Sequence, residues 1–100
     1  MLAKPNKTVI EGAVRAIKPA KDGVGHDFEI EVYRNLSLGH EEDFIQPAEG
    51  QALHLFAAEQ PNAAIGDLVR VQARLLGGPF GERTVLERVE PLSKQPNSAA

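Results

Sequence analysis

The sequence predicts a small all-β domain in which five short strands surround one hydrophobic core. Between positions 69 and 75 the odd-numbered residues are apolar and the even-numbered residues are polar. Residues 27–38 show a similar alternation. Because successive side chains of a strand point to opposite faces of the sheet, strict alternation is typical of half-buried strands. The chain has no internal repeat and no long amphipathic helix. Five antiparallel strands on one core then form a small closed barrel or a sandwich.

The first expected strand covers residues 7–18 and is interrupted by a glycine. Its alternation slips at Gly12. A glycine inside a strand pattern commonly marks a bulge or a sharp bend, which a strand needs when it turns the corner of a barrel. Pro19 ends the strand, and a turn centred on Asp22 and Gly23 follows.

The second strand is expected over residues 27–38, with Leu36 and Leu38 on the same apolar face as Phe28. Residues 39–50 are polar and predict a loop. The third strand, residues 51–57, has Leu53 and Leu55 pointing inward and His54 and Phe56 pointing outward. Pro61 limits residues 58–64 to about one helical turn.

The last two strands form a hairpin within residues 64–92. A turn at Ile65-Gly66-Asp67 precedes the fourth strand, and the glycine-rich segment 77–81 joins it to the fifth. We expect a flexible leader over residues 1–7, one domain over residues 8–92 and a disordered tail over residues 93–100.

Length and composition indicate an ordinary globular domain. One hundred residues are enough for a modest core. The absence of cysteine excludes disulfides, thiolate zinc sites and cysteine nucleophiles. The N-terminal segment is too short and too polar for a signal peptide, and no apolar run approaches the ~18 residues that cross a membrane. We therefore expect a cytoplasmic protein.

Residues 8–92 carry three features that resemble the OB-fold. These are Gly12 inside the first strand, the Asp22-Gly23 turn before the alternating DFEIEV, and the segment IGDLVRVQARLL. The last is similar to the entry into the fourth strand of replication-protein-A-like and other single-strand-binding OB domains. The resemblance implies a five-stranded Greek-key barrel with little or no helix, because the helix expected between the third and fourth strands is reduced to residues 58–64.

The resemblance also implies where a ligand would bind. OB-folds bind oligonucleotides on the second and third strands and the flanking loops, where aromatic rings stack on bases and cations contact phosphates. An alternative is that the outward aromatic rings only cap the end of the barrel. The resemblance predicts weak, non-specific binding of single-stranded DNA or RNA through Tyr33, Phe56, Phe80, Lys21, Arg74 and Arg83.

The distribution of charge favours a different function. Residues 27–67 contain one arginine and nine acidic residues, a net charge of −8. A phosphate backbone needs cations, because neutralised phosphates supply most of the non-specific affinity. The alternative function is a protein-interaction or assembly domain. It would dock a basic protein partner or a second copy of the chain through an edge strand or the acidic loop 39–50.

Other chemistry has little support in the sequence. The adjacent residues His40, Glu41, Glu42 and Asp43 match no known metal-binding loop. The segment 77–81 lacks the lysine and the following helix of a phosphate-binding loop. We expect no enzymatic activity, no cofactor and no bound metal.

Overall fold

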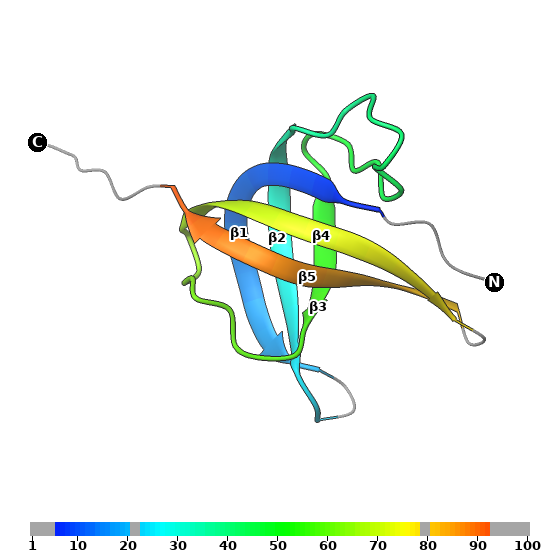
Figure 1. Cartoon of the computed structure of the whole chain (residues 1–100). Coiled ribbons are helices and arrows are strands. Elements are labelled where there is room, and N and C mark those ends of the chain that lie inside the picture. Colours follow the sequence, from blue (N-terminus) through cyan, green and yellow to red (C-terminus); the bar gives the residue numbers. More distant parts are fainter. Residues whose placement is uncertain (1–5, 21–22, 79–80, 93–100) are drawn as a thin grey trace, which may run out of the picture.

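In the computed structural model, which describes residues 6–20, 23–78 and 81–92, five strands close into a barrel (Figure 1). Neighbouring strands follow the order β1-β2-β3-β5-β4, and β1 pairs with both β2 and β4. The described residues contain no helix, and so none that is long and apolar enough to cross a membrane. The predicted all-β barrel is confirmed, and its architecture is compatible with an OB-like fold. The strands are β1 (Thr8–Pro19), β2 (His26–Asn35), β3 (Ala52–Ala57), β4 (Leu68–Gly78) and β5 (Gly81–Pro91).

The first strand bends so that it can pair on both sides. Its first half pairs with β4, and most of its length pairs with β2. Gly12 lies at a register shift between β1 and β2, where a Cβ atom would be 2.1 Å from the carbonyl oxygen of Glu31. Only a residue without a side chain allows the two backbones to come this close. The bend predicted at Gly12 is therefore confirmed.

The core consists of the inward side chains of β1 to β4, with Leu86 and Val89 of β5 packed against them. The inward residues predicted for β3 and for most of β4 are buried, namely Leu53, Leu55, Val69, Val71 and Ala73, whereas Leu75 at the end of the pattern is half-buried. Each fully buried aliphatic or aromatic side chain contributes about 1.5–3 kcal/mol. The buried cluster comprises Ile10, Val14, Phe28, Ile30, Val32, Leu53, Leu55, Val69, Val71 and Ala73.

The end of β2 differs from the prediction. The strand stops at Asn35, and residues 36–39 form a turn that leaves the Leu38 side chain 77% exposed. The physical reason is the Asn35 side chain, whose Oδ1 accepts a hydrogen bond from the backbone N–H of Ser37 at 2.8 Å. Such a local bond favours a turn over a continued strand. The expected inward position of Leu38 is therefore wrong.

The loop after β2 is held by a buried carboxylate. Asp43 is only 3% exposed, and its two oxygens accept hydrogen bonds from the Thr8 hydroxyl at 2.7 Å, the Asn35 amide at 3.0 Å and the Gln46 backbone at 2.8 Å. Burial alone would raise the pKa of the Asp43 carboxyl, but the hydrogen bonds from Asn35, Thr8 and the loop backbone lower it below its ordinary value. Asp43 therefore ties the loop to β1 and β2.

The ends of the described chain include one further link. Residues 1–5 of the expected leader and the whole expected tail lie outside the described residues. The Asn6 side chain, by contrast, donates to the carbonyl of Leu75 at 3.1 Å and accepts from its N–H at 2.8 Å. Asn6 thus continues the contact between β1 and β4 before β1 begins.

Replacing Gly12 by alanine is expected to destabilise the barrel by about 3 kcal/mol, the upper end for overpacked cores. The added methyl group would meet the Glu31 carbonyl at 2.1 Å and Ile30 Cγ2 at 2.9 Å, so the backbone must shift. Gly77→Ala is the control, because no atom of the described residues lies within 4 Å of a Cβ there. Urea unfolding followed by circular dichroism measures both changes. Equal losses would show that close packing at Gly12 is unimportant.

Asp43→Asn is expected to cost about 1–3 kcal/mol at neutral pH, because an amide N–H₂ would face the donors that the carboxylate now satisfies. Since the folded pKa of Asp43 is lowered, the wild-type carboxylate stabilises the fold above the ordinary aspartate pKa. That stabilisation disappears as the pH falls through the folded pKa. Urea unfolding at about pH 6 and about pH 3 should show that the difference in unfolding free energy between the wild type and Asp43→Asn is smaller at the lower pH. A constant difference would contradict this role, and Glu41→Gln in the exposed part of the loop is the control.

Candidate functional site

The register of β1, β2 and β3 arranges their outward side chains in rows across the sheet. We call this surface the outer face. Each row contains one residue of β1, one of β2 and one of β3, and the β2 residue is acidic in all three rows. In order along the face, the rows are Lys18, Asp27 and Phe56; Ala16, Glu29 and His54; and Ala13, Glu31 and Ala52.

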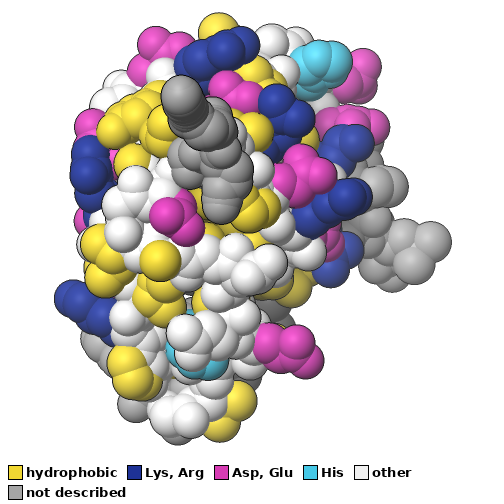
Figure 2. Space-filling view, turned by 90° about the vertical axis from the view of Figure 1, so that its left-hand side faces the viewer, with side chains coloured by type: hydrophobic (Ala, Val, Ile, Leu, Met, Phe, Trp, Pro, Cys, Tyr) yellow, Lys and Arg dark blue, Asp and Glu magenta, His cyan; other side chains and the backbone are white. Residues whose placement is uncertain are grey.

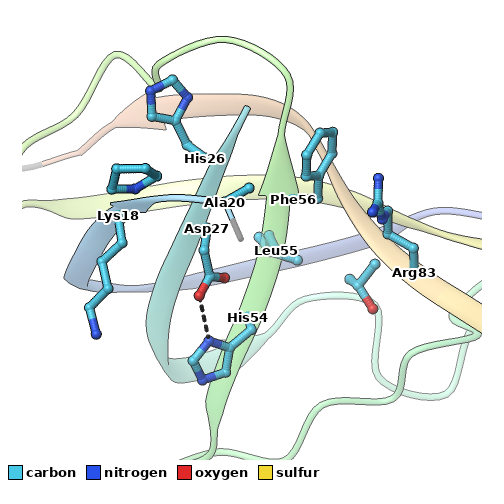
Figure 3. Close-up of a pocket in the computed structure, with 10 residues that line it drawn as sticks. Lys18, Ala20, His26, Asp27, His54, Leu55, Phe56 and Arg83 are labelled. Atoms are coloured by element: carbon cyan, nitrogen blue, oxygen red, sulfur yellow. Dashed lines mark ion pairs between the residues drawn. The ribbon is translucent and has the colours of Figure 1, made fainter. Parts of the chain in front are cut away.

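A hollow of about 560 Å³ lies beside the first row (Figure 3). Its lining combines the ring of Phe56 with the basic side chains of Lys18 and Arg83, which Figure 3 shows on opposite sides. The imidazoles of His26 and His54 also line it. Its size falls in the ~300–1,000 Å³ range of small-molecule sites.

The Phe56 ring is held from two sides. The single bridge between β3 and β5 in the described residues joins Phe56 to Val85, which places the Arg83 guanidinium carbon 4.3 Å from the ring centroid. Such a cation–π contact stabilises by about 0.5–1 kcal/mol at an exposed site. Gly25, with φ of 81°, lies against the ring, because a Cβ there would be 2.6 Å from two ring atoms. The ring is therefore held in one orientation before any ligand binds.

The basic side chains around the hollow differ in whether an acidic side chain lies beside them. Within the described residues, no ion pair involves Lys18 or Arg83. His54, in contrast, lies between two carboxylates: Nδ1 is 3.5 Å from Asp27 Oδ2, and Nε2 is 3.9 Å from Glu29 Oε1. Figure 3 shows Asp27 and His54 pointing toward each other from β2 and β3. Among the described residues, the buried Nδ1 of His26 has no hydrogen-bond partner.

At the other end of the outer face, the side chains of Arg15, Glu31 and Tyr33 bond to one another. A register shift between Val14 and Ala16 leaves Arg15 as an extra residue that reaches across to β2. Its guanidinium donates from Nε and Nη2 to Glu31 Oε1 and from Nη2 to the Tyr33 hydroxyl at 3.3 Å. The hydrogen bond and the charge of Glu31 raise the pKa of Arg15. Arg15 and Tyr33 thus bind to groups of the protein itself.

The structure brings two of the six predicted site residues together, Phe56 and Arg83. Tyr33 is 44% exposed, but it lies six positions beyond Asp27 on β2, about 20 Å away at 3.3 Å per residue. Arg74 Nε bonds to Glu87 at 2.9 Å on a different part of the barrel. The Phe80 and Lys21 predictions fall outside the described residues.

Sequence reasoning did not find the histidines of the site. It assigned no binding role to His26 or His54, and both line the hollow. The alternation in residues 51–57 places His54 beside Phe56 on the outward face, and this was the available signal. The pairing of His54 with Asp27 depends on the register between β2 and β3, for which the sequence has no local marker.

Asp43 and Glu31, two of the nine acidic residues of the segment 27–67, are engaged by other groups of the protein. Asp43 is buried, and Glu31 pairs with Arg15. On the side shown in Figure 2, basic and acidic side chains are interspersed. In the described part of the chain, no group of three or more acidic or histidine side chains is placed to hold a metal ion.

Gly25→Ala is expected to destabilise the fold more than Gly23→Ala. Both glycines have positive φ, 81° and 78°, so both substitutions carry the left-handed strain of about 1–2 kcal/mol. Only the Cβ at position 25 would also collide with the Phe56 ring, whereas no atom of the described part of the chain lies within 4 Å of a Cβ at position 23. Thermal unfolding of the two variants isolates this contact. Equal losses would show that Gly25 does not hold the ring.

Comparison of the chain with protein-family models, curated proteins and solved structures finds no significant match. The function is therefore inferred from the geometry of the chain itself.

Proposed function

We propose that this chain is an OB-like binding module that holds single-stranded nucleic acid at the hollow beside Phe56. The observation that carries the proposal is the Phe56–Arg83 contact at 4.3 Å. Lys18 lies across the hollow from this contact (Figure 3). Single-strand-binding proteins combine aromatic stacking with cations that contact the backbone. The similarity of IGDLVRVQARLL to the replication-protein-A-like class supports the same function by analogy.

Each side chain has a distinct role in this proposal. A base stacks on the composite surface of the Phe56 ring and the Arg83 guanidinium, which Gly25 keeps in a fixed orientation. Lys18 and Arg83 contact the phosphates on either side of that base, because neither forms an ion pair with an acidic side chain in the described residues. Pro19 adds apolar contact within the hollow.

The number of cations sets the expected strength and salt dependence. Two phosphate contacts on a single strand give a slope of about −1.4 in log K against log salt, since each contributes about −0.7. Asp27 lies in the same row as Lys18 and Phe56, Glu29 lies in the next row, and both carboxylates reduce the attraction for phosphate. Weak, sequence-independent binding at low salt is therefore expected.

Phe56→Leu and Arg83→Gln are expected to weaken the binding of labelled dT15, measured by fluorescence anisotropy at about 50 mM salt. Loss of the stacking ring should lower the affinity at least about five-fold, because base stacking contributes ~1–3 kcal/mol. Arg83→Gln should also reduce the salt slope by about 0.7.

Arg88→Gln provides the matched control for these variants. It removes the same charge from the same strand, but Arg88 pairs with Glu90 at 3.4 Å and does not line the hollow. We expect its affinity to stay near that of the wild type. An unchanged anisotropy for the wild-type protein at high micromolar concentration would overturn the proposal. So would equal losses for Arg83→Gln and Arg88→Gln. Circular dichroism confirms that each variant is folded.

A further inference from the structure

We infer that the hollow takes a short ligand, one nucleobase with its adjoining phosphates, and that the rest of the outer face excludes a longer strand. This inference rests on the proposed function and defines the class of ligand for the same site. Single-strand-binding OB modules occupy ~4–16 nucleotides. Three features of the outer face indicate that this barrel occupies fewer.

The first feature is the line of carboxylates on β2. Glu29 and Glu31 occupy the two outward positions between Asp27, at the hollow, and Tyr33, at the far end. A strand that ran along β2 from Phe56 to Tyr33 would therefore place its phosphates over both carboxylates. The negative phosphates and carboxylates would repel each other, and this repulsion weakens binding along the whole path.

The second feature is the lack of available cations beside these carboxylates. The flanking positions in the Glu29 and Glu31 rows are alanines on β1, Ala16 and Ala13, with His54 and Ala52 on β3. Arg15 is the cation nearest to this path, and it donates to Glu31 from two nitrogens. A phosphate that recruited Arg15 would leave Glu31 without its partner. The path therefore offers a polyanion no net attraction.

The third feature is the separation of the two outward aromatic rings. Tyr33 lies about 20 Å from the first row, at 3.3 Å per residue, and its hydroxyl accepts a hydrogen bond from Arg15. Between Tyr33 and Phe56, the described part of the outer face carries one further ring, the imidazole of His54, and this ring itself lines the hollow. Stacking is thus available at the hollow alone. A footprint of roughly one to three nucleotides follows, below the range of extended single-strand modules.

A length series tests the inference. Thymidine monophosphate, dT3, dT6, dT15 and dT30 are titrated into the full chain at about 50 mM salt by isothermal calorimetry. From dT3 to dT30 we expect the affinity to rise only in proportion to the number of overlapping sites, with several proteins bound to each long strand. An affinity that rises more steeply, with one protein covering six or more nucleotides, would overturn the inference.

The shortest ligands distinguish two sources of the same chemistry. If thymidine monophosphate binds as tightly as dT3, the inference is supported and a free nucleotide is sufficient. If dT3 binds and the monophosphate does not, the inference is also supported, and the ligand is a short segment or end of a strand. Failure of every ligand to bind would instead overturn the proposed function. The two failures are therefore distinguishable.

Glu31→Gln tests the acidic barrier directly. The substitution removes one carboxylate from the path and weakens the hold on Arg15. We expect it to raise the affinity for dT15 about two- to five-fold, the range for one exposed charge pair, while the affinity for dT3 stays unchanged. Glu41→Gln removes the same charge from the exposed loop and should change neither. Equal gains for dT3 and dT15 in the Glu31 variant would overturn the role of the barrier.

Discussion

The whole barrel depends on how closely β1 approaches β2 at Gly12. At this position the carbonyl of Glu31 occupies the space that a side chain would need. The approach lets β1 bend and pair with β2 and β4 at once, which closes the barrel. It also sets the register that follows. The next irregularity, at Arg15, shifts β1 by one residue and brings Lys18 into the row that contains Phe56.

Alternation in the sequence predicted which residues face the core, because this property depends on the strand period alone. The inward and outward assignments within β3 are correct for this reason. The end of β2 was not predictable in the same way. Asn35 stops the strand by bonding to Ser37 and also donates to Asp43, eight positions later. The pattern of apolar residues carries no information about such polar contacts.

The candidate site shows the same division. Alternation was sufficient to place Phe56 outward, but its contact with Arg83 depends on the parallel pairing of β3 with β5, which lie far apart in the sequence. Arg74 looks equivalent to Arg83 in a count of charges, yet it faces Glu87. A net charge describes a segment, whereas binding depends on which charges remain unneutralised after folding. Those pairings require the three-dimensional register.

The single bridge between β3 and β5 makes this junction the most weakly hydrogen-bonded seam in the described barrel. Local opening of a protein begins where few backbone bonds must break. The hollow spans that seam, because its lining includes Leu55 and Phe56 from β3 and Arg83 and Thr84 from β5. A molecule bound in the hollow would contact both strands and hold them together. Binding at the hollow and the closed state of the barrel are therefore thermodynamically linked.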